Sequence, residues 1–132
     1  MEGFEANRAP AQARGRDERF PRRYRLGKNR NYRYVYRRGK AHPSRSMVLI
    51  YLKGRDLKLG FSVSGKVGNA VTRNRIRRIL REDARQLRAE LKGGKYIFVA
   101  RPSARDVRHE LLAREMRSVL SRAKLLNEAG EQ

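Results

Sequence analysis

The pattern of residues 70–91 constrains the fold more than any other part of the sequence. Its apolar residues recur at the spacing of one helix face, at Ile76, Leu80, Ala84, Leu87 and Leu91. At about 100° per residue, a different sector of the same helix collects Asn74, Arg77, Arg78, Arg81, Arg85 and Arg88. Asn69 precedes the helix and can accept a hydrogen bond from its first turn. The pattern predicts a long helix with one side buried and the other side available to phosphate.

Two other helices and a buried strand are predicted from shorter apolar patterns. Residues 29–38 form a helix in which Tyr32 and Tyr36 share a face. Residues 96–100 form an apolar strand after a Gly-Gly pair. The last helix has core spacing at Leu112, Met116, Val119, Leu120 and Ala123. Helices and strands therefore mix along a chain of 132 residues, which has room for one α+β domain.

A hairpin of two antiparallel strands is predicted between the first and the long helix. Residues 47–53 are rich in β-branched and aromatic side chains, and a turn at 54–56 leads into a second strand at 57–64. In the second strand the apolar positions are Leu57, Leu59, Phe61 and Val63. The alternate positions are Lys58, Gly60, Ser62 and Ser64. We expect the apolar face to meet the core and the small side chains to leave room for a foreign backbone on the other face.

The charge balance indicates a polyanionic partner. The chain has 34 Lys and Arg against 13 Asp and Glu, a net charge of +21. Residues 1–22 carry five Arg and four acids without an apolar pattern, which predicts a flexible tail. The cationic part is therefore the domain that we expect at residues 23–126, followed by a frayed end at 127–132. Nucleic acid is the usual partner of such a domain.

Several other classes of function find little support in the composition. The chain has no Cys and two scattered His, His42 and His109, which we expect to be ordinary surface residues rather than metal ligands or bases. It also lacks a Gly-rich phosphate loop, so we expect no catalytic residue on the protein itself. No apolar run approaches the roughly 18 residues that span a bilayer, and the N-terminal stretch lacks the apolar centre of a signal peptide. A cytoplasmic protein without membrane contact is expected.

The segment from Leu59 to Arg78 carries a family resemblance. It runs LGFSVSGKVGNAVTRNRIRR, a strand with small side chains followed by K-x-G-N-A-V-x-R-N-R-I-x-R at the start of a basic helix. This resembles the signature of the bacterial ribonuclease P protein family. The order of elements between residues 25 and 123 is also similar to that of the family.

The resemblance implies a fold and a function. The fold is αβββαβα, a two-layer sandwich with a left-handed crossover, in which a short extra strand lies near residues 40–42. The function is that of a protein subunit that assists a catalytic RNA in removing the 5′ leader from precursor tRNA. The implied partners are that RNA and the leader, without an obligate protein partner. Magnesium is expected mainly on the RNA, with no metal or cofactor bound by the protein alone.

Two sets of site residues follow from the resemblance. The long helix and its preceding loop would face the catalytic RNA through Lys66, Asn69, Arg73, Asn74, Arg75, Arg77, Arg78 and Arg81. A cleft for the single-stranded leader would be lined by Tyr32, Tyr36, Tyr51, Ser62, Ser64 and Lys66. The alternative for Tyr32 and Tyr36 is a place in the core, where both rings would pack the first helix onto the sheet. For the arginine face, the alternative is a solvated surface, which the scarcity of acids there disfavours.

Other RNA- and DNA-directed functions are open to the sequence. A structural, ribosomal-type RNA-binding protein would account for the charge equally well. A DNA-binding regulator is disfavoured because no short helix precedes the long one in a helix-turn-helix arrangement. A free-standing nuclease is disfavoured because no acid, base or metal cluster is evident.

Overall fold

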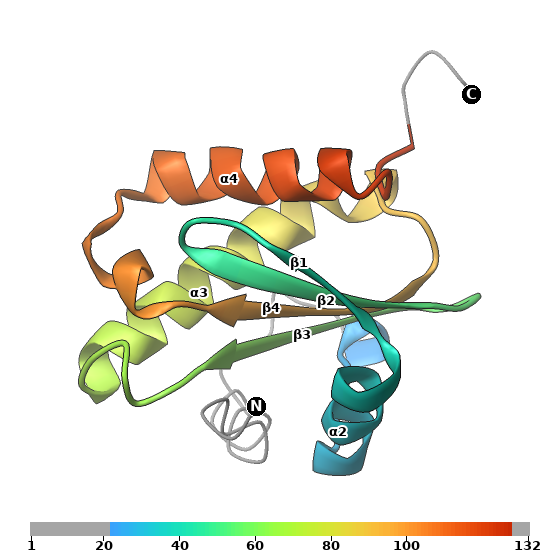
Figure 1. Cartoon of the computed structure of the whole chain (residues 1–132), viewed down its shortest axis with the longest axis horizontal. Coiled ribbons are helices and arrows are strands. Elements are labelled where there is room, and N and C mark those ends of the chain that lie inside the picture. The colour runs from blue at the N-terminus through green and yellow to red at the C-terminus, as the bar shows by residue number, and fades with distance from the viewer. Residues whose placement is uncertain (1–21, 128–132) are drawn as a thin grey trace.

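The computed structural model describes residues 22–127 as one α+β domain (Figure 1). The predicted N-terminal tail, apart from Arg22, and most of the predicted frayed end lie outside these residues. The elements are η2 (Arg22–Tyr24), α2 (Asn29–Arg38), β1 (Lys40–Pro43), β2 (Met47–Lys53), β3 (Leu57–Val63), α3 (Ala70–Leu87), η3 (Arg88–Glu90), β4 (Gly94–Ala100), η4 (Pro102–Asp106) and α4 (His109–Arg122). The order of helices and strands is the αβββαβα order that the resemblance implied, with the extra strand β1 in the expected place.

The four strands form one sheet in the order β1-β2-β4-β3. β2 pairs antiparallel with β1 and with β4, whereas β3 runs parallel to β4 and is connected to it through α3. The predicted hairpin is therefore wrong in its pairing. β2 and β3 do run in opposite directions, but β4 lies between them, so no ladder of hydrogen bonds joins the two. The hand of the α3 connection stays a prediction, because strand order alone does not determine it.

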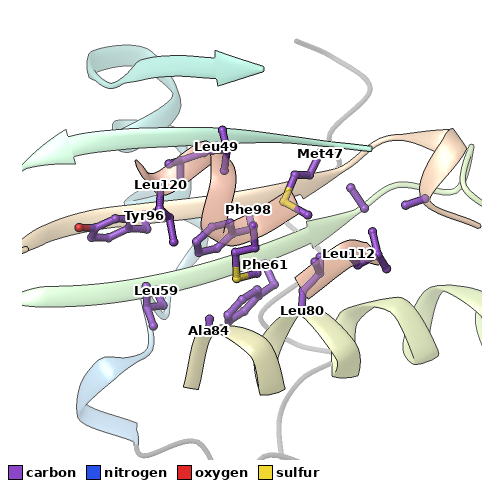
Figure 2. Close-up of a cluster of buried hydrophobic side chains, with 14 of the residues drawn as sticks. Met47, Leu49, Leu59, Phe61, Leu80, Ala84, Tyr96, Phe98, Leu112 and Leu120 are labelled. Carbon is purple, nitrogen blue, oxygen red and sulfur yellow. The ribbon is translucent and has the colours of Figure 1, made fainter. Parts of the chain in front are cut away.

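One face of the sheet packs against α3 and α4 and forms the larger core. Met47, Leu49, Phe61, Tyr96 and Phe98 meet apolar side chains of the two helices there (Figure 2). The helix residues are Ile76, Leu80, Ala84, Leu87, Leu112, Met116, Val119 and Leu120. The apolar stripes predicted for both helices thus have the expected role. Leu91, which follows η3, is also buried in this core, and Ala123, at the end of α4, packs against it.

The other face of the sheet carries α2, and in Figure 1 this helix lies on the side of the sheet away from α4. Leu26, Tyr32 and Val35 pack there against Ile50, Ile97 and Val99 in a second, smaller cluster. The helix therefore adds a partial third layer to the predicted two-layer sandwich. This happens because β2 and β4 are apolar on both of their faces.

Candidate nucleic-acid interface

The start of α3 is built as predicted from its capping residue. Asn69 Oδ1 accepts a hydrogen bond of 2.9 Å from the backbone N–H of Thr72, which satisfies one of the unpaired amides of the first turn. The side-chain oxygen of Asn69 thus fixes the start of the helix. The residue is exposed, so the rest of its amide group remains accessible to a ligand. Lys66 is exposed in the turn just before it.

The predicted RNA-facing residues of α3 differ in how accessible they are. Asn74 and Arg78 are exposed, whereas Arg73, Arg75 and Arg81 are partly buried. Arg73 Nη1 donates to the carbonyl of Gly68 at 3.3 Å, and Arg75 Nη2 donates to the carbonyl of Arg105 at 3.2 Å. Each guanidinium has five donor hydrogens, so both can hold a neighbouring loop and still present donors outward.

Arg77 does not belong to the open surface, which corrects the prediction for this residue. Its side chain is buried, with 4% exposed, and Nη1 donates to Asn74 Oδ1 at 2.9 Å. Burial lowers the pKa of the guanidinium, and the nearby charges of Arg81 and Arg73 lower it further. Its position on the boundary between the apolar and basic sectors explains the burial. Arg77 therefore holds the side chain of exposed Asn74 in place, and its buried charge adds to the positive electrostatic potential of this helix face.

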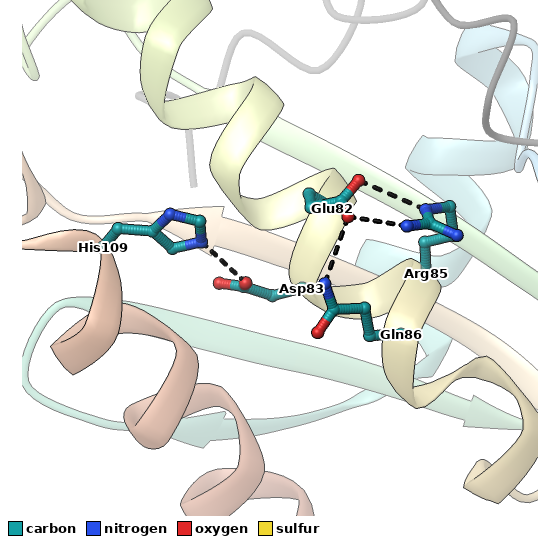
Figure 3. A network of polar contacts seen from close by, with 5 residues as sticks. All are labelled: Glu82, Asp83, Arg85, Gln86 and His109. Atoms are coloured by element: carbon teal, nitrogen blue, oxygen red, sulfur yellow. Dashed lines mark hydrogen bonds and ion pairs between the residues drawn. The ribbon is translucent and has the colours of Figure 1, made fainter.

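The stretch of α3 that contains no acid ends at Glu82. Arg85 Nη2 lies 2.6 Å from Glu82 Oε2, and Gln86 Nε2 donates to the same oxygen at 3.1 Å (Figure 3). From residue 66 to residue 81 the chain has no acid, so the N-terminal half of α3 is the part whose charge needs an external partner. Beyond that point the helix neutralises its own charge.

His109 has a partner that the sequence did not indicate. Its Nε2 lies 2.9 Å from Oδ1 of Asp83, a carboxylate with 5% exposed surface between α3 and α4 (Figure 3). Burial raises the pKa of Asp83, and the hydrogen bond and charge of His109 partly offset this shift. His109 is exposed, as predicted for a surface residue, and its contact with Asp83 also joins the two helices at the edge of the larger core.

Tyr32 belongs to the core, as the alternative interpretation of the sequence held. Its ring has 5% exposed surface and its hydroxyl accepts a hydrogen bond from the backbone N–H of Phe61 at 3.1 Å. The ring lies so close to Gly60 that a Cβ there would come within 2.7 Å of the hydroxyl oxygen. Gly60 therefore makes room for α2 rather than for a foreign backbone, and Tyr32 cannot offer its face to a base.

Tyr36 lies one turn further along α2 and is only partly buried. Burial raises the pKa of its hydroxyl well above the usual range, and a hydrogen bond with Ser62 opposes this shift. Ser62 and Ser64 are themselves buried, with 0% and 8% exposed surface, and Ser64 Oγ accepts from the backbone N–H of Lys66. The structure thus brings Tyr36 together with Ser62, and connects Ser64 to the start of the basic region.

Tyr51 lies on the opposite face of the sheet from Tyr36, so its assignment to the leader cleft is wrong. Its ring packs against Tyr96 with centroids 4.8 Å apart, and its hydroxyl donates to the carbonyl of Gly93 at 2.6 Å. The reason is the register of β2. Ile50, one residue earlier, is the side chain that faces α2.

Sequence reasoning missed a second basic surface, which lies on another flank of α2. A pocket of about 490 Å³ opens there, and the ring of Tyr34, with 41% exposed surface, lies against Lys95 of its lining. The pocket is lined by Arg25, Leu26, Asn31, Lys53, Gly54, Arg55, Asp56, Lys58 and Lys95. No local signal in the sequence could have revealed it, because its lining comes from segments that are distant along the chain.

Neither a metal cluster nor a membrane span is found among residues 22–127. Groups of three or more His, Asp or Glu in a position to hold a metal ion are absent from this part of the chain. In the same residues, no helix has the length and apolar character that crossing a bilayer requires.

Known proteins are similar to this chain in both sequence and fold. Residues 20–124 match the model of the family described as Ribonuclease P. The ribonuclease P protein component of Staphylococcus carnosus is 39% identical over 79% of this chain and 93% of its own, and that of a Nitratiruptor species is 39% identical over 75% and 91%. The solved structure of the Staphylococcus aureus RNase P protein has a TM-score of 0.74 and 32% identity, and covers 79% of this chain and 98% of the other.

Proposed function

Because the chain belongs to the ribonuclease P protein family, we propose that it uses two surfaces, one for the catalytic RNA and one for the leader of precursor tRNA. Family membership makes it a protein subunit of a ribonucleoprotein endoribonuclease that removes the 5′ leader in tRNA processing. The ribosomal-type alternative is set aside for this reason. What remains to be proposed is which residues meet which RNA.

The catalytic RNA docks on the N-terminal half of α3 and the loop before it. The observation that carries this proposal is the acid-free stretch from residue 66 to residue 81, in which Lys66, Asn74 and Arg78 are exposed. Arg guanidinium groups bind phosphate through two parallel hydrogen bonds, and the helix N-terminus adds backbone amides. Buried Arg77 contributes through the field and through its bond to Asn74.

The leader passes along the α2 side of the sheet beside Tyr36, Ser62 and Ser64. These residues lead from the edge of α2 to Lys66 at the start of the basic region. A base stacked on an aromatic ring gains about 1–3 kcal/mol without regard to its sequence, which suits a subunit that serves many precursors. Tyr32 supports this surface from within the core.

Magnesium belongs to the RNA partner in this proposal. Residues 22–127 offer no cluster of acids or histidines that fits a metal ion. The protein supplies positive charge where two polyanions meet and so lowers their repulsion. We place this activity in the cytoplasm, where bacterial precursor tRNA is made.

Cleavage of a precursor tRNA by a ribonuclease P RNA at low magnesium tests the proposal. Repulsion between the RNAs is least screened under this condition, so addition of the protein should raise the rate of cleavage at the mature 5′ end. An Arg78→Ala variant should need a higher protein concentration for the same rate. Arg114→Ala, which removes an exposed charge from α4, serves as the matched control. Equal rates with and without the protein would overturn the proposal.

A further inference from the structure

The pocket beside α2 has the charge of an anion site. Five of its lining residues are cations, namely Arg25, Lys53, Arg55, Lys58 and Lys95, and one is an acid, Asp56. Within residues 22–127, no ion pair joins Lys53, Arg55, Lys58 or Lys95 to an acid. The lining therefore has an excess of positive charge, with one carboxylate, Asp56, among its five cations. Such an arrangement favours a ligand that carries negative charge.

The walls of the pocket are held in place by hydrogen bonds to the backbone. Asn31 Nδ2 donates to the carbonyl of Leu26 at 2.9 Å, and Lys58 Nζ donates to the carbonyl of Arg23 at 2.6 Å. The N–H of Leu26 in turn donates to the carbonyl of Leu59 at 2.9 Å, which attaches this segment to the edge of β3. The pocket is thus a preformed feature of the fold, and its volume of about 490 Å³ falls in the range of small-ligand sites.

An exposed aromatic ring lies next to this charge. Lys95 Nζ is 5.6 Å from the centroid of the Tyr34 ring, and the guanidinium of Arg38 is 5.8 Å from it. Asn31, Tyr34 and Arg38 follow one another at i, i+3 and i+7 along α2, so they share a side of the helix. Exposed aromatic rings beside lysines and arginines are the usual platform for the bases of single-stranded nucleic acid.

We infer that this pocket binds a phosphate group of single-stranded RNA, with the adjoining base stacked on Tyr34. The site is separate from the surface of Tyr36 and Ser62, because Tyr34 and Asn31 do not belong to the buried side of α2 that meets β3. The inference depends on the proposed function only in taking RNA as the ligand. The phosphate can come from the leader or from the catalytic RNA.

Binding of a single-stranded uridine oligonucleotide of about ten nucleotides to the full-length protein alone tests the inference. Fluorescence anisotropy over a series of salt concentrations gives both affinity and salt dependence. Tyr34→Ala should weaken binding roughly 5- to 150-fold, whereas Tyr34→Phe, which keeps the ring, should bind like the wild type. Lys95→Gln should reduce the slope of log affinity against log salt by about 0.7, the value for one phosphate contact to a single strand.

Arg114→Ala is the control for loss of one exposed positive charge, since Arg114 lies on α4 across the sheet from the pocket. The inference is overturned if Tyr34→Ala and Lys95→Gln bind the oligonucleotide as Arg114→Ala does, or if the wild type does not bind it at all. Circular dichroism of each variant confirms that it is folded. Stimulation of cleavage by the wild type, measured separately, distinguishes failure of this site from failure of the proposed function.

A second arm identifies the source of the phosphate. The Lys95→Gln protein is assembled with the catalytic RNA, and its affinity is measured for precursors with a long and with a very short leader. A loss of affinity confined to the long leader assigns the pocket to the leader. A loss of assembly with the catalytic RNA itself assigns it to that RNA, and a loss of neither overturns the inference.

Discussion

The two faces of the sheet differ in the size of the side chains that fill them. The face under α3 and α4 is filled by aromatic and aliphatic side chains such as Phe61, Tyr96 and Phe98. The face under α2 has a smaller apolar cluster, and along β3 it carries Lys58, Gly60 and Ser62 in place of large side chains. The same strands therefore hold large aromatic side chains on one side, and on the other side hold small side chains that α2 covers, with Lys58 partly exposed at one end. The alternation within β3 thus allows α2 to approach the sheet closely, beside the proposed path of the leader.

The largest effect, on the free energy of unfolding, should come from a cavity in the core under α3 and α4. Phe98 is fully buried between Phe61 and Tyr96, with ring centroids 5.8 and 6.3 Å away. Phe98→Ala should lower the free energy of unfolding by about 3–5 kcal/mol through lost burial and a cavity. Ser62→Ala, on the other face, should cost only about 1 kcal/mol, the net value of one hydrogen bond. Urea denaturation of both variants measures the two losses in free energy of unfolding. Equal losses would contradict the difference between the two faces.

A smaller effect on binding, with almost none on stability, is expected on the basic side of α3. Arg78 is exposed and its side chain makes no ion pair within the described residues. Arg78→Ala should weaken assembly with the catalytic RNA and lower the salt slope by about 1, while the free energy of unfolding changes by less than about 0.5 kcal/mol. Filter binding at several salt concentrations measures this. An unchanged slope would show that α3 does not meet phosphate at this residue.

The smallest effect should be a pH dependence at the edge of the larger core. Burial raises the pKa of Asp83 in the folded protein above its value in the unfolded chain. The neutral carboxyl therefore contributes its full stability below the ordinary pKa of Asp, and this contribution is lost as the pH rises through the raised pKa. Asp83→Asn cannot ionise and keeps an acceptor for His109. The variant should match the wild type at acidic pH and become the more stable protein toward neutral pH.

Thermal or urea unfolding of Asp83→Asn across this pH range provides the check. Glu82 opposes ionisation of Asp83 as well, whereas His109 favours it. If the variant were less stable than the wild type at neutral pH, the attraction of His109 would outweigh the cost of burial.

Local patterns predicted much of this fold. The cap at Asn69 and the apolar stripe of α3 are consequences of residues a few positions apart, and the structure confirms both. The pairing of β2 and β3 was predicted wrongly because β4, which separates them, comes some thirty residues later. Alternation within a strand shows which side chains share a face, but it does not show which strand lies beside it.

The same limit applies to the candidate site. β2 is apolar on both faces, so its pattern could not tell that Ile50 faces α2 and Tyr51 does not. The depth of Tyr32 depends on Gly60 of β3, a residue distant in sequence. The basic face of α3 was predicted in outline because it lies on one helix, although the burial of Arg77 depends on what packs against that helix.

The proposed role of the α2 face in binding the leader is tested most directly by the affinity of a Tyr36→Ala complex for precursor and for mature tRNA. The protein, assembled with its catalytic RNA, should bind the precursor roughly 5- to 150-fold more weakly than the wild type, since one stacked base is lost. Its affinity for mature tRNA, which has no leader, should stay the same. Equal weakening of both, in a variant that remains folded, would contradict the account, because the α2 face would then serve the structure rather than the leader.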